Sequence, residues 1–560
     1  MKEKIISLLK KETKLLEKEI ENLIEIPPSK ELGDYSFPCF ILSKKFKQPP
    51  QKIAEDLAKK IRDDSFEKIE SKGPYINFFI NRKEIAKTIL EQVQKKDFGK
   101  KNLKQKVILE FPSPNTNKPL HIGHARNIVF GQSIAELIKF CGANVKILNL
   151  NNDRGIHICK SMVALEKFGK NDSPEKAKKK SDHFVGGYYV KFADESKKNP
   201  ELENLAKECL IKWEAKDSAT IKQWKKMNSW ALKGFRETYK KFNLSFDKEY
   251  FESGIYDKGK EIILDVKNKK FIKQKPDGAY YINLEEEGLG EKILLRADKT
   301  SIYITQDIYL ALLKNKDFKP DKSVYITATE QIYHFKVLFA LLEKLGYAKQ
   351  SNLEHLYYGM VNLESGRMKS REGTVVDVDD LISELETIAE KELQKRDSKL
   401  KKEEKKKRAE AIAMAALRYY FLKIERTKDM IFKPEESINF EGNTGPYLLY
   451  TYARAKSILR KSKKSHSKKI SPREIEDKEK NLLFQLGQFP EVVDKAFDAL
   501  APNLIANYAY HLAQTFNEFY HSTKVLGSEQ EQFRLVLVDS FSKVLKISLS
   551  LLGIQTLEKM

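Results

Sequence analysis

Cysteine is scarce in this sequence. Its 560 residues include four cysteines, Cys39, Cys141, Cys159 and Cys209. No two of them form a Cys-x-x-Cys pair, which argues against a structural zinc knuckle. Their spacing does not indicate a disulfide framework, which agrees with a reducing compartment. We therefore expect a cytoplasmic protein without a structural metal.

Long apolar runs are also missing. The sequence has no run of about 18 apolar residues, so we expect no membrane span. The N-terminal stretch MKEKIISLLKKETKLLEKEI is typical of an amphipathic helix, because Ile and Leu recur at spacings of three and four. It lacks the continuous apolar core of a secretory signal peptide.

Positive charge is present in excess. Lys and Arg number 103 against 80 Asp and Glu, which gives a formal net charge of +23. Such a surplus favours a polyanionic partner, most commonly a nucleic acid. A lysine-rich composition with no such partner is the alternative. The length of 560 residues and the 41% hydrophobic content predict two to four packed domains.

The patterns along the chain divide it into three regions. Residues 1–100, with the strand pattern GPYINFFI, are typical of a small α+β domain. Residues 101–400 open with the strand KVILEF, a helix over about 123–140 and the strand NVKILNL. This βαβ unit predicts an α/β domain with a doubly wound parallel, Rossmann-like sheet. Residues 160–245 are typical of a charged helical insertion, and residues 401–560 are mainly helical.

Three later segments are expected to complete the middle region. KKFIKQKPDGAYYINL predicts a hairpin that turns at Pro276, Asp277 and Gly278. TSIYITQDIYLALL and SVYITATEQIYHFKVLFALLEKLG each predict a strand followed by a helix. These two units would return the chain to the sheet.

The stretch PSPNTNKPLHIGHARN, residues 112–127, contains two histidines three positions apart. His121 and His124 follow a predicted strand and open a predicted helix, where free N–H groups and the helix dipole attract phosphate. Gly123 permits close approach of a ligand to the backbone. Imidazoles can donate to phosphate oxygens that gain charge in a transition state. These features favour a phosphate site.

The two histidines also permit two other interpretations. Zinc proteases space their histidines four apart with a glutamate between them, whereas Ile122 and Gly123 stand between these two. Ordinary helix-cap histidines without catalytic function remain possible on the local pattern alone.

The letters HIGH match the signature of class I aminoacyl-tRNA synthetases, whose catalytic domain is a nucleotide-binding parallel sheet. A second signature of that class, Lys-Met-Ser-Lys-Ser, resembles GRMKSREGTVV at residues 366–376. Aligned on Met368, Arg367 takes the place of the first lysine and Ser370 that of the second. The resemblance implies that Met368, Lys369, Ser370 and Arg371 act near the phosphates, although one lysine is missing.

The stretch SPNTNKPLHIGHARN resembles the version of the motif found in arginyl-tRNA synthetases. Members of this family that lack the second lysine tend to carry a lysine just upstream of the histidines, where Lys118 stands. A phosphate needs a cation nearby, and a lysine can approach it from either wall of a pocket. The alternative for Lys118 is a solvent-exposed loop lysine.

The resemblance to arginyl-tRNA synthetases extends over nearly the whole chain. It implies an N-terminal domain that reads the tRNA elbow at its D-loop and a helical C-terminal anticodon-binding domain. The segments that carry it include VILEFPSPN, NNDRGIHICKSM, YFESGIY, SIYITQDI, ATEQIYHFKVL, YYGMVNL, EGNTGPYLLYTYARAKSILR, LLGIQTLEKM, LGDYSFPCF and KGPYINFFI.

The resemblance also implies residue roles. A guanidinium needs planar, bidentate carboxylate partners, and Glu252 and Asp307 match those positions. Tyr303 can stack on the guanidinium. The remaining residues expected at the substrate arginine are Glu110, Ser113, Asn115 and Gln331. Those expected at ATP are Gly123, His124, His334, Gly359, Met360 and Val361. Those expected at tRNA are Tyr75, Asn77, Tyr447, Tyr450 and Arg454, although an aromatic stripe at this helical spacing is also typical of a core.

The expected reaction activates L-arginine with ATP, accompanied by Mg²⁺, and transfers it to the terminal adenosine of tRNA-Arg. By resemblance the protein is a monomer. One rival is another class I synthetase, such as that for cysteine, against which Glu252 and Asp307 argue. The other is a catalytically inactive relative that serves as a tRNA-binding module.

Overall fold

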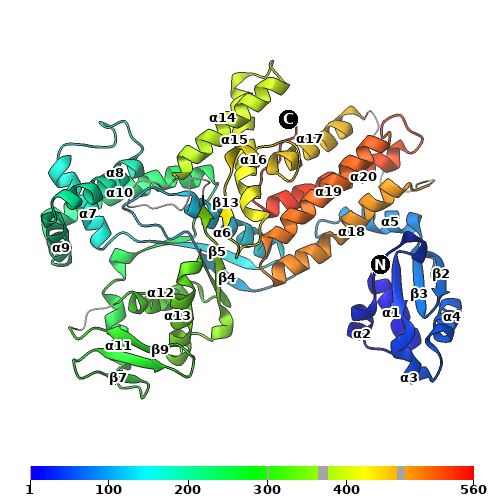
Figure 1. The fold of residues 1–560 in the computed structure, drawn as a ribbon, viewed down its shortest axis with the longest axis horizontal. Helices are drawn as coiled ribbons and strands as arrows, with labels where there is room; N and C mark the ends of the chain where they lie inside the picture. The colour runs from blue at the N-terminus through cyan, green and yellow to red at the C-terminus, as the bar shows by residue number, and fades with distance from the viewer. Residues whose placement is uncertain (1, 299–301, 363–375, 463–471, 473) are drawn as a thin grey trace. The chain divides into compact units, whose positions relative to one another are not determined.

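The computed structural model describes residues 2–298, 302–362, 376–462, 472 and 474–560 (Figure 1). The chain forms two compact units, each assembled from separate stretches of sequence. The first contains Met1–Phe98, Arg454–Phe489 and Leu512–Val544, and the second contains Gly99–Ala453, Pro490–His511 and Leu545–Met560. Within the described ranges, no helix has the length and apolar character needed to cross a membrane.

A five-stranded parallel sheet is the centre of the second unit. Its strands lie in the order β11-β10-β4-β5-β6. The order runs outward from β4 in both directions, which confirms the predicted doubly wound α/β fold. Val107, Ile108 and Leu109 are all buried, as expected where both faces of a parallel sheet are covered. The strands are β4 (Lys106–Glu110), β5 (Asn144–Asn151), β6 (Lys248–Phe251), β10 (Lys322–Ala328) and β11 (Leu353–Tyr358).

Helix α6 (Ile122–Phe140) connects β4 to β5 and approaches the end of β4 closely. A Cβ atom at Gly131 would lie 2.6 Å from the ring of Phe111, so only glycine fits here. Helix α6 therefore packs against the carboxyl end of β4, beside the point where the strand order reverses. Ligands bind at this point in doubly wound sheets.

The strand predicted at TSIYIT, residues 300–305, is wrong for residues 302–305, which the structure describes. Helix α12 begins at Tyr303 and runs to Phe318, so residues 303–305 are helical. Ile304 and Ile308 are both buried, and their spacing of four places them on one helix face. Residues 299–301 lie outside the described residues. The strand and helix predicted next are confirmed as β10 and α13 (Ile332–Lys344).

Four insertion helices follow β5 and pack around a core of their own that includes Met162, Phe184 and Phe192 (Figure 1). They are α7 (Ile156–Phe168), α8 (Ser181–Lys198), α9 (Glu201–Glu214) and α10 (Ser218–Lys241). Beyond β6 lie α11 (Lys258–Val266) and an antiparallel sheet of β7 (Ile272–Gln274), β8 (Tyr280–Leu284) and β9 (Gly290–Leu295). The predicted hairpin is confirmed, since the N–H of Lys275 donates to the carbonyl of Ala279 at 2.8 Å.

The remainder of the second unit is mostly helical. The short strands β12 (Val361–Asn362) and β13 (Met430–Ile431) pair in parallel. Its further helices are α14 (Val378–Arg396), α15 (Lys402–Leu422) and α16 (Pro434–Ser437). Helices α17 (Gly445–Lys461), α18 (Asp477–Asp498), α19 (Pro502–Ser522) and α20 (Glu531–Leu551) contribute residues to both units.

The first unit combines a small antiparallel sheet with parts of the C-terminal helices. The sheet order is β1-β3-β2, with β1 (Tyr35–Pro38), β2 (Phe66–Lys72) and β3 (Tyr75–Ile80). Its helices are α1 (Lys2–Thr13), α2 (Glu17–Leu23), α3 (Ser43–Phe46), α4 (Pro50–Lys60) and α5 (Arg82–Val93). The predicted N-terminal helix is thus two helices, because Lys14 adopts a positive φ of 55°.

Candidate active site

The two histidines of the HIGH motif form the N-terminal cap of α6. The Nδ1 atom of His121 accepts the N–H of Gly123 at 3.1 Å, and Nδ1 of His124 accepts the N–H of His121 at 3.1 Å. Their ring centroids lie 3.9 Å apart. Since each Nδ1 accepts a hydrogen bond, the proton of each neutral imidazole is on Nε2. The cap therefore leaves two Nε2–H donors available.

Both imidazoles are neutral at neutral pH. Burial, with the positive charge of Lys118, lowers the pKa of His121 to about 4. Burial, with the neighbouring His121 and Lys118, lowers the pKa of His124 well below its usual value. The motif therefore presents hydrogen-bond donors rather than fixed charges, and Lys118 supplies positive charge beside them.

Lys118 and His121 line the same cavity, which has a volume of about 420 Å³. Helix α8 forms another wall through His183, Gly186 and Tyr189. The structure thus brings the upstream lysine to the same cavity as the HIGH motif. Its contribution to catalysis stays a prediction.

The backbone just after the second signature pairs with the first. The N–H of Ile122 donates to the carbonyl of Val376, and the N–H of Val378 donates to the carbonyl of Leu120, both at 3.1 Å. Asp377 lies opposite His121 in this antiparallel bridge. The loop residues Arg367, Met368, Lys369, Ser370 and Arg371 lie outside the described residues, so their expected roles stay predictions.

Glu252 lies directly after β6, at the carboxyl edge of the sheet, and is 8% exposed. Burial raises its pKa to about 7. The nearby carboxylates of Asp153 and Asp307 add to this increase, whereas the positive charge of Arg154 opposes it. A buried acidic group in this environment gains from a cationic ligand. Asp307, on α12, contacts Nε2 of His334 through Oδ2 at 2.6 Å. Tyr303, one helical turn earlier, is 75% exposed and can cover a ligand.

Asp153 is a site residue that sequence reasoning missed. Its carboxylate accepts the N–H of Ser253 at 2.8 Å and the hydroxyl of Ser253 at 2.7 Å. These bonds hold the turn that presents Glu252. Its position within the block NNDRGIHICKSM, which carries the family resemblance, was the available signal.

The other residues expected at the arginine differ in their surroundings. The carboxylate of Glu110 forms an ion pair with the buried ammonium of Lys314 on α12, so it already has an internal partner. The N–H of Ser113 donates to Oδ1 of Asn149 at 3.1 Å. Asn115 and Gln331 are exposed. The roles of these four residues stay predictions.

The backbone expected to hold adenine is organised by Arg126, which sequence reasoning also missed. Its guanidinium donates to the carbonyl of Gly359, to that of Met360 at 3.2 Å, and to that of Lys428 at 2.9 Å. Burial lowers its pKa to about 10. The signal was a charged residue in the apolar run that follows HIGH. His334, expected at ATP, lies at hydrogen-bonding distance from Asp307, and its role at ATP stays a prediction.

The residues expected at the tRNA elbow lie on β3 of the first unit. Tyr75 is half-buried, and its ring meets that of the exposed Phe40 edge-on at 5.8 Å. Asn77 is 2% exposed, which leaves its side chain almost no surface for a base. The expected elbow contact therefore rests on Tyr75.

The residues expected at the anticodon lie on α17, and all three are half-buried. The ring of Tyr447 lies 5.7 Å from that of Tyr510. The guanidinium of Arg396 lies 5.7 Å from the ring of Tyr450. Arg454 donates to Oδ1 of Asn517 at 2.7 Å, and its guanidinium lies 5.0 Å from the ring of Tyr520.

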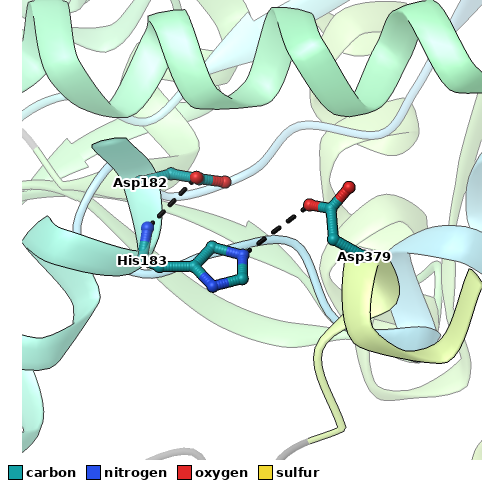
Figure 2. Close-up of side chains that lie close together, drawn as sticks. All are labelled: Asp182, His183 and Asp379. Atoms are coloured by element: carbon teal, nitrogen blue, oxygen red, sulfur yellow. Dashed lines mark hydrogen bonds and ion pairs between the residues drawn. The ribbon is translucent and has the colours of Figure 1, made fainter. Parts of the chain in front are cut away.

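Asp182, His183 and Asp379 have ligand atoms within 4.8 Å of one another, as a metal site requires (Figure 2). However, Lys180 lies 2.9 Å from the carboxylate of Asp182 and 2.8 Å from that of Asp379. Burial disfavours protonation of His183, but the nearby carboxylates of Asp377 and Asp379 outweigh it and raise its pKa to about 10. Because Lys180 already offsets the charge of Asp182 and Asp379, the chemistry of this group favours an ion-pair cluster.

Three families of known proteins match successive parts of the chain. "tRNA synthetases class I (R), catalytic domain" matches residues 84–433. "DALR anticodon binding domain" matches residues 448–560, and "Arginyl tRNA synthetase N terminal domain" matches residues 1–80.

Relatives named arginine–tRNA ligase resemble the chain over nearly its whole length. The protein of Treponema denticola is 42% identical over 557 residues, covering 96% of this chain and 94% of the relative. The protein of Borrelia turicatae is 41% identical over 558 residues, covering 97% of this chain and 95% of the relative.

Solved structures agree with these matches. The arginyl-tRNA synthetase of Thermus thermophilus superposes with a TM-score of 0.81 at 26% identity, covering 96% of both chains. That of Plasmodium falciparum gives a TM-score of 0.76 at 23% identity, covering 96% of this chain and 94% of the other, and shows the shared fold. The chain therefore belongs to the arginyl-tRNA synthetases, a family of class I aminoacyl-tRNA synthetases.

Proposed function

We propose that the protein is an arginine–tRNA ligase. It activates L-arginine with ATP to arginyl-adenylate and pyrophosphate, and then transfers the arginyl group to the terminal adenosine of tRNA-Arg, releasing AMP. The observation that supports this most directly is Glu252, a buried carboxyl at the strand ends whose pKa is raised to about 7 by burial and neighbouring carboxylates. A guanidinium would supply the positive charge that this group lacks.

In the first step the carboxylate oxygen of arginine attacks the α-phosphorus of ATP, and the bond to the bridging oxygen breaks. The protein acts mainly by positioning and charge stabilisation. The Nε2–H groups of His121 and His124 donate to phosphate oxygens, and Lys118 offsets their negative charge. ATP arrives with Mg²⁺, and residues 367–371 contribute from the second signature. Gly359, Met360 and Val361 hold the adenine through backbone groups.

The tRNA is bound outside the catalytic domain as well. We assign residues 1–100 to the tRNA elbow, residues 101–400 to catalysis and residues 401–560 to the anticodon. Aromatic stacking and basic side chains, here Tyr447, Tyr450 and Arg454, are the usual means of binding unstacked bases. A cytoplasmic location, expected from the cysteines and the missing apolar runs, and a monomeric state, expected from family resemblance, remain predictions.

The decisive test is the full reaction with purified protein. ATP–pyrophosphate exchange is measured with arginine, citrulline or cysteine, each with and without tRNA-Arg, and aminoacylation is measured with tRNA-Arg and with an unrelated tRNA. We expect exchange with arginine alone among these amino acids, and charging of tRNA-Arg. Cysteine-dependent exchange would identify another class I synthetase. Tight tRNA binding without exchange would identify an inactive tRNA-binding relative.

A further inference from the structure

A cluster of ionic side chains connects two insertion helices to the start of α14. Asp379 is its centre, on the first turn of α14. Its carboxylate lies 2.8 Å from the ammonium of Lys180, accepts the hydroxyl of Thr238 at 2.8 Å, and lies 3.0 Å from the ammonium of Lys241. Lys180 directly precedes α8, whereas Thr238 and Lys241 lie on α10.

His183, on α8, adds a second connection. Its Nε2 lies 3.1 Å from Oδ2 of Asp377 and 3.7 Å from Oδ2 of Asp379, and Figure 2 shows the ring directed toward Asp379. Asp182 completes the cluster, 2.9 Å from Lys180. The carboxylates of Asp182, Asp377 and Asp379 are thus matched by the cations of Lys180, His183 and Lys241. A matched set of this kind has little reason to bind a further ion.

The fold makes room for this cluster at a specific position. A Cβ atom at Gly234 of α10 would lie 2.2 Å from Oδ1 of Asp182. Asp182 is completely buried, and its charge is tolerated there because Lys180 lies against it. The close approach of α8 to α10 therefore fixes where Lys180 and His183 meet α14.

Asp377 carries the connection to the catalytic motif. One oxygen of its carboxylate meets His183, and the other accepts the N–H of Asp379 at 2.8 Å. Its backbone lies opposite His121, and the preceding carbonyl, that of Val376, accepts the N–H of Ile122. The first N–H groups of a helix have no partner within the helix. Segment 376–378 therefore provides part of the N-terminal cap of α6.

We propose that Lys180 and His183 are positioning residues for the catalytic histidines. By holding Asp377 and Asp379, they fix segment 376–378 against Leu120–Ile122 and so fix the direction of the His121 ring. Neither side chain needs to touch a substrate for this role. The proposal rests on the proposed function, because it concerns the rate of adenylate formation.

The mechanism follows from the cost of an unmatched buried charge. Without the His183 cation, the carboxylate of Asp377 turns toward water, and the backbone that pairs with His121 moves with it. A displacement of about 1 Å at a catalytic group can cost about 100-fold in rate. In this role the His183 cation acts through segment 376–378 rather than on the substrate, so the loss should appear in kcat rather than in KM.

The test measures ATP–pyrophosphate exchange and thermal unfolding in parallel, in the presence of tRNA-Arg. His183→Ala removes the cation, and His183→Arg keeps it. Asp317→Asn is the matched control, because Asp317, near the C-terminal end of α12, forms another ion pair of the same unit, with Lys248 on β6 at 2.6 Å. Lys180→Met tests the second cation. If His183→Ala does not fold, His183→Gln replaces it, since glutamine keeps a donor without the charge.

We expect His183→Ala to lower kcat by about 10- to 100-fold, with both KM values changed less than about threefold. His183→Arg should recover a rate within about threefold of the unaltered protein, and Asp317→Asn should retain its full rate per folded molecule. The proposal is overturned if His183→Ala loses activity only in proportion to its unfolded fraction, or if His183→Arg fails to recover activity in a folded protein. An unaltered protein without exchange activity would instead refute the proposed function.

Discussion

The side chain of Arg126 and the backbone carbonyl of Gly359, 233 positions apart in sequence, are joined by a hydrogen bond. Arg126 lies on α6, five residues after His121, and the same guanidinium also reaches the carbonyl of Arg426 at 3.1 Å. Two backbone segments, residues 359–360 and 426–428, therefore meet at one buried cation on α6. The phosphate end and the proposed adenine end of the site are held by one helix.

Arg126→Lys should weaken ATP use. An ammonium cannot reproduce the planar fork that spans several carbonyls, so some acceptors lose their partner. We expect the KM for ATP in the exchange reaction to rise by about tenfold and the free energy of unfolding to fall by about 2 kcal/mol. Arg408→Lys, which alters the Arg408–Glu404 pair within α15, is the control. An unchanged KM for ATP in a destabilised variant would make Arg126 purely structural.

Asp307→Asn should reduce arginine use while ATP affinity stays nearly constant. The variant would deprive the bound guanidinium of arginine of one carboxylate partner. Such a loss costs roughly 2–4 kcal/mol, or about 30- to 1000-fold in kcat/KM for arginine. The same substitution at Asp317, ten residues along α12, is the control. Competition between arginine and citrulline is the measurement, and equal discrimination by the variant would show that the pocket is misassigned.

Arginine binding should release a proton near neutral pH. The folded-state pKa of Glu252 is raised from 4.5 to about 7, so the free protein favours the neutral acid and loses stability as pH rises through this interval. A bound guanidinium favours the carboxylate, so arginine affinity should increase as pH rises from about 6 to 8. Calorimetric titration in buffers of different ionisation enthalpy measures the released proton.

Glu252→Gln is the control for this proton release. It should bind arginine more weakly, with an affinity that varies little over the same pH interval. A wild-type affinity that is independent of pH would contradict the assignment of Glu252 to the guanidinium.

Lys118→Ala should lower the kcat of adenylate formation by roughly 10²- to 10³-fold, because one preorganised positive group is lost beside the phosphates. Adding Ser370→Lys should restore part of the rate, whereas Ser370→Lys alone should help little. A double-mutant cycle on the exchange rate measures this non-additivity. Full activity in Lys118→Ala would reduce Lys118 to an ordinary loop lysine.

Arg454→Ala combined with Tyr450→Ala should raise the KM for tRNA and leave the KM for arginine unchanged. The affinity for tRNA should also fall steeply with salt, because phosphate contacts dominate nucleic-acid binding. Lys495→Ala, an exposed change on α18, controls for net charge. A tRNA affinity that is insensitive to salt would refute the argument from the basic surface.

The sequence predicted the sheet well because its strands are short apolar runs between recognisable helices. β4, β5 and β10 were all expected from such runs. The segment at Tyr303 was misjudged because Ile302, Tyr303 and Ile304 have strand propensity, whereas burial of Ile304 and Ile308 selects the helix. The strand propensity of three residues is a weaker determinant than the burial of one face of α12 against its neighbours.

The position of the HIGH motif at a helix start could be predicted, because the strand, the motif and the helix are adjacent in sequence. Long-range relationships could not be predicted in the same way. The ion pair of Glu110 with Lys314 and the bonds of Arg126 to Gly359 depend on which strands become neighbours. Asn77 and Tyr75 are two residues apart and therefore lie on the same face of β3. This spacing does not reveal that the side chain of Asn77 is buried.

Helix α6 has a consequence for the order of events during protein synthesis. The hydroxyl of Ser133 donates to the carbonyl of Leu551, 418 positions later. The guanidinium of Arg126 donates to the carbonyls of Gly359 and Lys428, which also come much later in the sequence. A ribosome makes α6 long before it makes any of these groups. The helix that carries the HIGH motif therefore reaches its native surroundings only after most of the chain has been translated. Nascent chains that end before Leu551 should therefore contain helix α6 without the hydrogen bond from Ser133 to Leu551.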